Sequence, residues 1–535
     1  MAVAPLDTSL LRRARYSEGA GIYRIVPRAV ARPGTLDELR DVIAACRHAG
    51  LSLVPRGAGS AMDGGNLGEG VVVDLTGYDP HRCEIASGER LAYLSPSVTY
   101  AALNAAAQSH RLRLPPDPSS GRHATIGGMV STNASGARTV RYGSVRPWVE
   151  SVILTGPEGD LELRRGVAPN PAHPVVQRWR RAAEPVIARH RAAIDARFPK
   201  VRKNSAGYAL DHFVASGDLV DLVIGAEGTL GVVTHIAMRL DPIPARRGAL
   251  RVALRSRDDL VPVMEILRAQ EPSSIEFLDA SFLRLIDDPL ATPERPGLLR
   301  EAAGLLLVDL ESDDFDDLSV RAGAAVKALA PIVLDTRFAL DAEEIDRLWE
   351  IRHGASPVLA RIADGRRSLQ VIEDGCVPPA RLAEYVTAVE AACRRQAIDA
   401  VMFGHAGDGH LHVNLLPNLN DRDWLDRVRA VYDEVTEAVL SLGGTPSGEH
   451  GAGRLRSGLL ARLYGPEVIK CFHAIKQAFD PMSLFNPGVI VDGRADPFVD
   501  LKVGAGAAPL PEGTAEYLRG IETGARWGDD RWIGA

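Results

Sequence analysis

The sequence predicts an α+β protein of two or three domains, and three observations support this prediction. The chain has 535 residues, which is too long for a single hydrophobic core. Residues 35–75 have the pattern of a helix, a short strand, a glycine-rich loop and a second buried strand. After Pro242 the pattern changes to strand–helix–strand alternation, which occurs twice and is typical of a ferredoxin-like fold.

Composition excludes several classes of protein. Hydrophobic residues make up 46% and charged residues 24% of the chain, which is ordinary for a soluble globular protein. The net charge of −7 argues against general nucleic-acid binding, so we expect no nucleic-acid partner. The five cysteines form no CxxC pair, which indicates a reduced compartment and excludes an iron–sulfur cluster held by clustered cysteines in this chain. The cations are nearly all arginine, which indicates a GC-rich, bacterial coding bias.

The first helix is expected at residues 35–49. Thr35 is the predicted N-cap, Glu38 completes a capping box, and Gly50 ends the helix. A strand is expected at 51–55. A second strand is expected at 70–75, so that a strand, and not a helix, follows the intervening glycine loop.

That loop, Arg56–Gly65, has the composition of a phosphate cradle. Gly57 and Gly59 allow the backbone to approach a pyrophosphate, and successive N–H groups form an anion nest. The loop is not the GxGxxG motif of a dinucleotide fold, because that motif opens a helix. A tight structural loop remains the alternative.

Two later segments repeat the glycine-rich texture. Residues 115–143 are rich in Gly, Ser, Thr and Asn but carry few charges, and residues 224–233 place glycines among β-branched side chains. Small residues with many hydrogen-bonding groups suit close approach to a large planar cofactor better than they suit a solvated linker.

The segment after Pro244 is expected to form the ferredoxin-like part. Strands are expected at 249–254, 273–280 and 304–310. Helices are expected at 257–268 and 314–329. A further strand follows, and the histidine-rich hairpin is a late strand pair of the same domain.

The histidine-rich stretch Gly404–Asn414 predicts strand, Asp-Gly turn and strand. His410, His412 and Asn414 alternate with apolar residues and therefore share one face of the outgoing strand. His405 ends the incoming strand and can meet that face. Converging imidazoles suit a divalent metal such as zinc, and Ser447–Gly453 offers a further ligand downstream.

These motifs together resemble a known flavoprotein family. The superfamily of vanillyl-alcohol oxidase and p-cresol methylhydroxylase (PCMH) is indicated by Pro55–Ser60, Thr125–Gly128 with Thr132–Ala134, and Glu227–Gly231. The resemblance narrows to the FAD-dependent D-2-hydroxyacid dehydrogenases, a group that includes D-lactate dehydrogenase, the flavin subunit of glycolate oxidase and D-2-hydroxyglutarate dehydrogenase. The resemblance to this narrower group is carried by four segments, His405–His412, Gly448–Gly451, Phe479–Pro481 and Asn486–Gly488. The resemblance as a whole covers about residues 20–493.

The resemblance implies a two-lobed PCMH-type FAD-binding domain with a ferredoxin-like α+β cap. The FAD-binding domain would comprise residues 1–243, with lobes of about 1–90 and 91–243. The cap would comprise 244–439, and 440–495 would return to the FAD-binding domain. Residues 496–535 are a tail for which the sequence gives no role.

The implied activity is oxidation of a D-2-hydroxy acid such as D-lactate to the 2-oxo acid. Electrons would pass to a quinone, a cytochrome or a separate iron–sulfur protein. FAD is expected to be non-covalent, because residues 56–70 contain no histidine that could link it. Two alternatives remain: a non-redox flavin transferase of the alkylglycerone-phosphate synthase type, and a flavin subunit of a glycolate oxidase-like complex.

The resemblance also assigns roles within the site. A divalent metal, zinc or else manganese or iron, would be bound by His405, His412 and Glu449. The catalytic residues would be His450 as the base, neutral near pH 7 because a free imidazole titrates near ~6.5, Arg352 for the substrate carboxylate with Ser356 as a weaker partner, and Asn414 as a hydrogen-bond partner. His410 is expected to lie behind the metal ligands and support them or the fold without binding the metal. Direct binding of the metal by His410 is the alternative.

The FAD cradle is expected to use residues from all three glycine-rich segments and from one late asparagine. They are Arg56, Gly57, Ala58, Gly59, Ser60, Asp117, Ser120, Thr125, Ile126, Gly127, Gly128, Ser131, Asn133, Gly136, Glu227, Gly228, Gly231, Val232 and Asn486.

Substrate choice and surroundings are expected as follows. Ile372 occupies the place where D-2-hydroxyglutarate enzymes have a lysine, which favours a monocarboxylate.

The basic run 178–203 suggests a solvated face or else contact with an anionic membrane or an acidic partner. Residues Met1–Asp7 have no secretory pattern and no apolar run of membrane length occurs, so a cytoplasmic location is expected, with peripheral association at the inner membrane face as the alternative. A homodimer is also expected.

Overall fold

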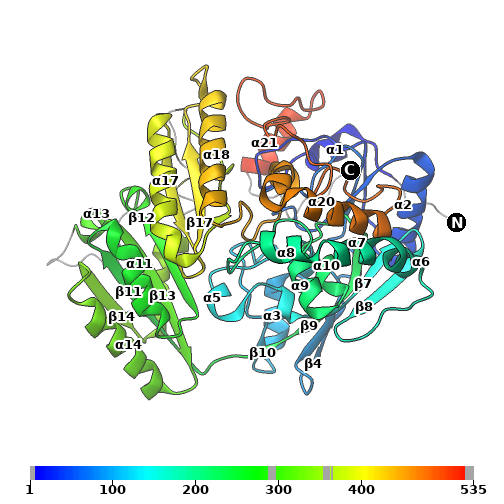
Figure 1. The fold of residues 1–535 in the computed structure, drawn as a ribbon. Helices are drawn as coiled ribbons and strands as arrows, with labels where there is room; N and C mark the ends of the chain where they lie inside the picture. Colours follow the sequence, from blue (N-terminus) through cyan, green and yellow to red (C-terminus); the bar gives the residue numbers. More distant parts are fainter. Residues whose placement is uncertain (1–5, 287–296, 354–358, 360–361, 363–364, 524–535) are drawn as a thin grey trace.

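A computed structural model describes residues 6–286, 297–353, 359, 362 and 365–523. Two bodies lie side by side (Figure 1). The cap, residues 244–442, is drawn in green and yellow at the left. The cofactor domain, residues 6–243 together with 443–523, lies at the right. This mixed α and β architecture agrees with the expected α+β class.

The first lobe of the cofactor domain is a small parallel sheet in the order β1-β3-β2. Thr35 caps its helix by accepting the N–H of Glu38 at 3.3 Å, and Gly50 ends the helix in the left-handed conformation (φ 63°), as expected. The reciprocal bond of the capping box differs from the expectation, because the Glu38 carboxylate accepts the N–H of Gly34 at 2.6 Å. The elements are α1 (Leu10–Arg15), β1 (Ala29–Ala31), α2 (Leu36–Ala49), β2 (Leu53–Arg56) and β3 (Val71–Asp74).

The second lobe is a five-stranded antiparallel sheet in the order β4-β5-β9-β7-β8. Because β4 begins at Cys83, the change of sheet falls a few residues before the expected lobe boundary near 90. The strands are β4 (Cys83–Ala86), β5 (Leu91–Leu94), β7 (Val149–Gly156), β8 (Gly159–Arg164) and β9 (Val232–Arg239), with the short pair β6 (Leu112–Arg113) and β10 (Asp241–Pro242) beside them.

Short helices cover this sheet and frame the glycine-rich segments. They are α3 (Tyr100–Gln108), α4 (Ile126–Thr132), α5 (Thr139–Tyr142), α6 (Pro174–Arg178), α7 (Glu184–Arg189), α8 (Arg191–Arg197), α9 (Leu210–Ser216) and α10 (Val220–Val223).

The cap is a seven-stranded antiparallel sheet in the order β14-β11-β13-β12-β16-β17-β15. The expected strands and helices agree with the observed ones to within a few residues, although the expected helix at 257–268 begins with a 3-10 turn. The first half consists of β11 (Arg246–Leu254), α11 (Leu260–Arg268), β12 (Ser274–Asp279), α12 (Ala280–Leu283), α13 (Leu298–Glu301), β13 (Gly304–Ser312), α14 (Phe315–Leu329) and β14 (Asp335–Ala339), followed by α15 (Ala342–His353).

The second half of the cap repeats the first but remains incomplete. It consists of β15 (Gly375–Cys376), α17 (Leu382–Arg395), β16 (Asp399–Gly404), β17 (His410–Leu416) and α18 (Trp424–Ser441), and it joins the first half where β12 pairs with β16. Where the first half adds its last strand, the second half has a single bridge from Thr445 to Cys376. The chain then leaves the cap, so Glu449 and His450 follow directly at the boundary between the domains.

The returning segment completes the cofactor domain. Helix α20 (Leu460–Phe479) packs in the core of the second lobe, and the short α19 (Gly453–Arg456) precedes it. Phe485 pairs in parallel with Leu53 at the edge of the first sheet. Residues 452–491 therefore contribute to the same hydrophobic core as residues 92–240.

The tail runs from the cap to the first lobe. Asp496 forms an ion pair with Arg429 of α18 at 2.7 Å, and Leu501 bridges to Tyr23. Helix α21 (Ala515–Thr523) follows, and its Leu518 packs against Ala14.

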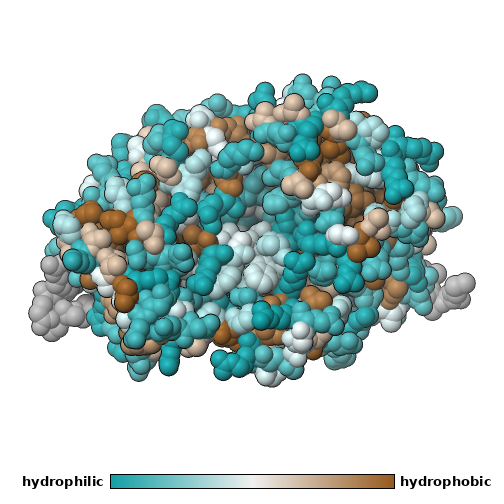
Figure 2. Space-filling model, turned by 60° about the horizontal axis from the view of Figure 1, so that its bottom comes forward, coloured by the Kyte–Doolittle hydropathy of each residue, from teal (hydrophilic) through white to brown (hydrophobic). Residues whose placement is uncertain are grey.

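The surface in Figure 2 is mostly hydrophilic, and its hydrophobic residues form small separate groups. Among the described residues, every helix is too short or too polar to cross a membrane.

Candidate functional site

A large cavity lies where the cap meets the cofactor domain. The glycine-rich segments around Gly57, Gly127 and Gly228 line one side of it. The cap and the returning segment line the other side with Arg352, Gln370, Phe403, His412, Asn414, Glu449 and His450. Groups suited to hold a cofactor and groups suited to act on a substrate therefore face the same space.

The cofactor side depends on the absence of side chains. A Cβ atom at Gly57 would lie 2.4 Å from the Oγ1 of Thr125. That Oγ1 caps helix α4 by accepting the N–H of Gly128 at 3.3 Å. The first and second glycine-rich segments therefore touch only because residue 57 has no side chain, and the cradle between them stays open for a ligand.

Most of the residues expected to bind FAD line the cavity. They are Arg56, Gly57, Ala58, Gly59, Ser60, Ser120, Thr125, Gly127, Gly128, Ser131, Glu227, Gly228 and Gly231. The guanidinium of Arg56 folds back and donates to the carbonyls of Tyr16 and Glu18, so it braces the loop from behind.

Six expected FAD residues lie outside the lining, so their role in FAD binding stays a prediction. Ile126 and Val232 are fully buried core residues. Asn133 ends α4 and accepts the N–H of Arg146, while Asp117 accepts the N–H of Arg138. The other two are Gly136, which packs against Asp117, and Asn486, which donates to the carbonyls of Gly65 and Glu227.

Glu227 lines the cavity, but its carboxyl group has partners within the protein. It accepts the N–H groups of Ala452 at 2.7 Å and Gly453 at 2.9 Å, and it lies against Asp63. Burial raises the pKa of both acids, and the neighbouring Asp63 raises that of Glu227 further. Glu227 and Asp63 therefore hold the loop that follows Glu449 and His450 against the cofactor domain. Asp63 was missed because nothing in its local sequence marks it.

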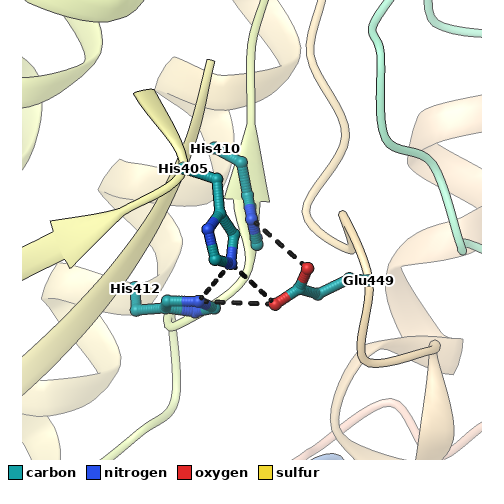
Figure 3. A group of neighbouring side chains, drawn as sticks. All are labelled: His405, His410, His412 and Glu449. Atoms are coloured by element: carbon teal, nitrogen blue, oxygen red, sulfur yellow. Dashed lines mark hydrogen bonds and ion pairs between the residues drawn. The ribbon is translucent and has the colours of Figure 1, made fainter. Parts of the chain in front are cut away.

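The histidine hairpin forms as expected, with β16, a 3-10 turn at Ala406–Asp408, and β17. Nε2 of His405 lies 3.4 Å from Nε2 of His412, and both nitrogens lie 3.3–3.4 Å from Oε1 of Glu449 (Figure 3). Tetrahedral ligands at metal bonds of about 2.0–2.1 Å would be separated by about 3.3–3.4 Å. The three expected ligands are therefore together and at a spacing that fits a divalent metal.

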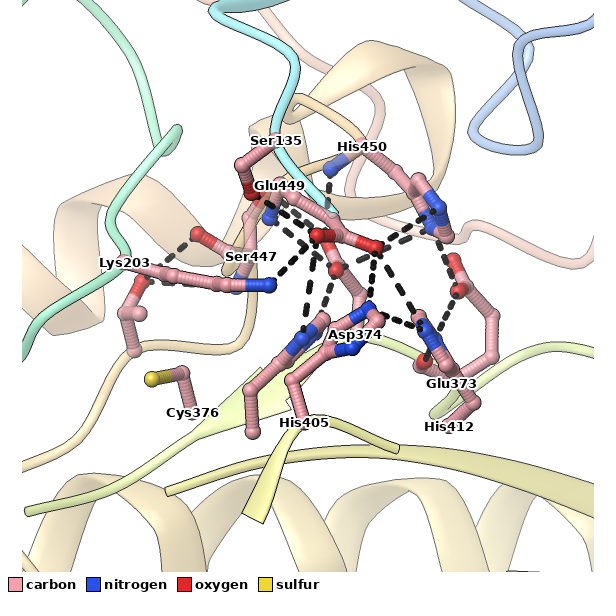
Figure 4. A network of polar contacts seen from close by, with 12 residues as sticks. Ser135, Lys203, Glu373, Asp374, Cys376, His405, His412, Ser447, Glu449 and His450 are labelled. Atoms are coloured by element: carbon pink, nitrogen blue, oxygen red, sulfur yellow. Dashed lines mark hydrogen bonds and ion pairs between the residues drawn. The ribbon is translucent and has the colours of Figure 1, made fainter. Parts of the chain in front are cut away.

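The second oxygen of Glu449 is held by the cofactor domain. Oε2 accepts bonds from Ser135 Oγ and Lys203 Nζ, both at 2.8 Å (Figure 4). Burial raises the pKa of Glu449, but Lys203 and His405 outweigh it and hold that pKa well below its usual value. Lys203 is only 2% exposed, so this last member of the expected basic run belongs to the site and not to a solvated face.

The rest of the basic run stays mostly at the surface. Arg180, Arg181, Arg189 and Arg197 are exposed. Arg178 pairs with Glu158.

His410 has a different environment from the other two histidines. Its Nε2 lies 2.9 Å from Asp374, and its Nδ1 is 3.9 Å from Oε2 of Glu449, the oxygen that Lys203 holds. Burial lowers the pKa of His410 to about 3, so the ring is neutral. This geometry favours the expected position behind the ligands.

His450 lies beside two buried carboxylates. Its Nδ1–H donates to Glu373 at 2.6 Å, and Arg456 also binds that carboxylate. Burial lowers the pKa of His450, but Glu373 and Asp374 outweigh it and raise that pKa to about 10. The two buried carboxylates favour the protonated ring, an effect that the expectation of a neutral imidazole at pH 7 did not include.

The two other residues expected to contact the substrate, Arg352 and Asn414, come from the cap and line the cavity. Asn414 Oδ1 accepts bonds from Ser368 and Gln370, each at 3.2 Å, which turns its amide nitrogen away from them. Arg352 stacks over Phe403 at 4.7 Å. Its expected weaker partner, Ser356, lies outside the described residues.

Ile372, the position expected to favour a monocarboxylate, lies outside the cavity lining. Ile372 packs in the apolar core of the cap near Tyr385, whereas Gln370 lines the cavity. Residues 371–374 do not form a regular strand, so alternation could not give the side that each residue faces.

Comparison with known proteins gives matches along most of the chain. The family of "FAD linked oxidases, C-terminal domain" matches residues 243–490, and the "FAD binding domain" family matches residues 27–163. Glycolate oxidase subunit GlcD of Bacillus subtilis is 30% identical over 471 residues, which cover 87% of this chain and 89% of that protein. D-lactate dehydrogenase of Archaeoglobus fulgidus is 29% identical and is covered to 93%, with 87% of this chain aligned.

D-2-hydroxyglutarate dehydrogenase of Pseudomonas putida is 30% identical over 88% of this chain. The chain spans about half of that relative's length, since 48% is covered. Among solved structures, p-cresol methylhydroxylase superposes with a TM-score of 0.65 over 91% of this chain and 93% of that one, at 15% identity. An alkyldihydroxyacetonephosphate synthase superposes with a TM-score of 0.60 over 90% of this chain and 82% of that one, at 14% identity. These two likenesses show the PCMH-type fold.

Proposed function

This chain belongs to the family of FAD-linked oxidases, and we propose that it oxidises a D-2-hydroxy acid, such as D-lactate, to the 2-oxo acid. The observation that carries the proposal is the shared cavity. Glycine-rich loops line one side of it, while His412, Asn414 and Glu449 line the other. D-lactate and glycolate are the substrates named for two of the most similar relatives.

FAD fits the cradle because the cavity wall there consists largely of backbone and small side chains. Gly57, Gly59, Gly127, Gly128, Gly228 and Gly231 all line it. Exposed N–H groups in such loops favour a pyrophosphate. The FAD would be dissociable, since residues 56–70 contain no histidine.

A divalent metal, zinc or else manganese or iron, would be held by His405, His412 and Glu449. Their donor atoms lie 3.3–3.4 Å apart, and three protein ligands leave a coordination position for substrate. When bound, the metal supplies Lewis acidity toward the substrate hydroxyl, and FAD supplies a two-electron acceptor. Lys203 and Ser135 occupy Oε2 of Glu449 and so leave Oε1 for the metal.

The proton of the substrate hydroxyl is assigned to Nε2 of His450. Because Nδ1–H is bound to Glu373, Nε2 is the ring atom left to exchange a proton. It lies 3.6 Å from Oε1 of Glu449, close to where the hydroxyl would be held. A divalent cation at Glu449 would lower the pKa of His450, since a nearby positive charge disfavours the protonated ring.

The substrate carboxylate is assigned to Arg352, with Asn414 as a second donor. A guanidinium offers several donors in one plane, which suits a carboxylate. Asn414 Nδ2 is buried and without a hydrogen-bond partner among the described residues, while its oxygen is occupied. Gln370, an uncharged side chain, lines the cavity beside them, which favours a small monocarboxylate.

A second candidate function is that of a flavin subunit that works only within a larger complex. The similarity to glycolate oxidase subunit GlcD favours this alternative. The electron acceptor would then be a partner protein, and not a quinone or cytochrome that reacts with the isolated chain. The transferase alternative has only the fold-level likeness in its favour.

A panel of D- and L-2-hydroxy acids, assayed with the FAD-loaded chain and an artificial dye, tests the proposal. We expect dye reduction with D-lactate or glycolate, none with L-acids, and loss of activity after chelation that the metal restores. If none of the 2-hydroxy acids in the panel supports dye reduction, the proposal is contradicted. Activity that appears only after addition of a partner protein would favour the subunit alternative.

A further inference from the structure

Glu276 lies between two groups of the site. It is on β12, next to the pairing of Phe277 with Gly404 that joins the two halves of the cap, and its side chain is 1% exposed. One oxygen, Oε1, accepts from Nδ1 of His405 at 2.5 Å, and the other, Oε2, accepts from Nε of Arg352 at 2.8 Å. A single carboxylate therefore contacts both a candidate metal ligand and the candidate substrate-binding arginine.

The bond to His405 fixes the direction of the ring. Because Nδ1–H is directed to Glu276, the other nitrogen, Nε2, faces Glu449 and His412. Carboxylates that bind the far nitrogen of a ligating histidine set its tautomer and orientation. Glu276 is thus placed to hold the ring in the form that a metal needs.

The bond to Arg352 fixes the guanidinium in the same way. Nε is directed to Glu276, and the plane of the group stacks on Phe403 at 4.7 Å. Both Arg352 and Phe403 line the cavity. The distance between the arginine and the metal ligands is therefore set by one side chain.

From these contacts we propose that Glu276 is a positioning residue that couples metal binding at His405 to substrate binding at Arg352. The inference rests on the function proposed above. Only a carboxylate can accept a hydrogen bond on each of its two end atoms in this place, since an amide offers one acceptor and one donor. Glutamine at position 276 would therefore leave His405 or Arg352 facing a donor.

The test compares Glu276→Gln with the wild type, both loaded with FAD. Zinc affinity is measured by equilibrium dialysis against a competing chelator, and KM and kcat for D-lactate are measured with a dye. We expect zinc affinity to fall about 10-fold to 100-fold, as is usual for loss of a partner behind a ligand. We expect KM to rise about tenfold, and FAD content to stay unchanged.

Asp279→Asn is the matched control. Asp279 lies on the same strand and is equally an acid, but it caps α12 by accepting the N–H of Phe282 at 2.8 Å. Asparagine is also a good cap, so zinc affinity and KM should stay as in the wild type. Glu276→Asp is the second variant: it keeps both acceptors but shortens the side chain, and it should give a smaller loss in both quantities.

Unchanged zinc affinity or unchanged KM in Glu276→Gln would overturn the inference, and so would equal losses in Asp279→Asn. If Glu276→Gln does not fold, unchanged values in Glu276→Asp would overturn it in the same way. A wild type that binds no divalent metal would overturn the metal assignment together with this inference. If the wild type binds zinc and oxidises D-lactate, and Glu276→Gln has the same zinc affinity and KM, this inference alone is overturned.

Discussion

The flavin cradle and the charged centre line the same cavity but are built by opposite means. The cradle, residues 55–66, 125–135 and 227–231, consists mainly of backbone and small side chains. The charged centre, namely Lys203, Glu373, Asp374, His405, His410 and Glu449, consists of ionisable side chains that are at most 6% exposed. In the cradle a missing Cβ atom makes room for a ligand, whereas in the centre each charge is held by an opposite charge from another segment.

This difference predicts that substitutions in the two regions impair different functions. Removal of a charge should damage metal binding and catalysis but leave the cradle able to bind FAD. An added side chain in the cradle should weaken FAD binding but leave the metal in place. Variants of each kind therefore test whether the two regions are independent.

The largest effect is expected from His405→Ala. Loss of one of three candidate ligands should abolish metal binding, and activity should fall at least about a thousandfold, because a Lewis acid contributes several kcal/mol to such a reaction. FAD content, measured by absorbance after gel filtration, should equal that of the wild type. Full activity of this variant would contradict the metal assignment.

Gly57→Val tests the cradle. The new Cβ would lie 2.4 Å from the Oγ1 that caps α4, and overpacking of this kind costs typically about 1–3 kcal/mol. We expect FAD affinity, measured by quenching of flavin fluorescence, to fall about 30-fold, with zinc affinity unchanged. Gly88→Ala is the control, because a Cβ there meets nothing within 4 Å. Equal FAD affinity in Gly57→Val and the wild type would contradict the account of the cradle.

Charge also joins the two domains away from the cavity, and this junction should respond to pH. Glu311 of the cap accepts two bonds from Arg113, each at 2.9 Å. Burial raises the pKa of Glu311, but Arg113 outweighs it and lowers that pKa to about 2. Because the pKa is lower in the folded state, the stabilisation is complete above the unfolded pKa of about 4.3 and is lost as the pH falls toward 2.

Glu311→Gln should therefore lower the free energy of unfolding by about 2–3 kcal/mol at pH 7, measured by urea denaturation. The difference from the wild type should shrink by about 1 kcal/mol at pH 3.5. A difference that stays constant over this range would show that the charge of Glu311 is not what stabilises the junction.

Ser135→Ala gives the smallest expected effect and examines the border between the regions. Ser135 lines the cavity as part of the cradle, but its hydroxyl donates to Glu449 at 2.8 Å. Loss of one hydrogen bond to a charged group costs about 1.5–3 kcal/mol, so zinc affinity should fall about tenfold. FAD affinity should change less than threefold. A larger loss of FAD than of zinc would place Ser135 with the cradle alone.

The sequence was sufficient where the signal is local. The hairpin from Gly404 to Asn414 carries its pattern within a few residues, and the glycine-rich loops are marked by composition. The two β-α-β units of the cap were also predicted, because periodicity and length define each element.

The sequence was insufficient where contacts are long-range. Lys203 and Glu449 are 246 positions apart, yet their side chains touch at 2.8 Å. Glu276 and Asp63 likewise have no local pattern that marks them. The raised pKa of His450 depends on Glu373 and Asp374, which only folding brings near. The burial of Ile372 could not be predicted for another reason, since the segment around it is irregular and has no alternation.

Anaerobic titration of the FAD-loaded, metal-loaded chain tests most directly the claim that cradle and charged centre act together on a D-2-hydroxy acid. Flavin absorbance is followed while D-lactate, glycolate or L-lactate is added, before and after removal of the metal by a chelator. We predict bleaching by D-lactate or glycolate, none by L-lactate, and none by any acid after chelation. A flavin that no 2-hydroxy acid bleaches, or that D-lactate bleaches equally well without the metal, would contradict the account.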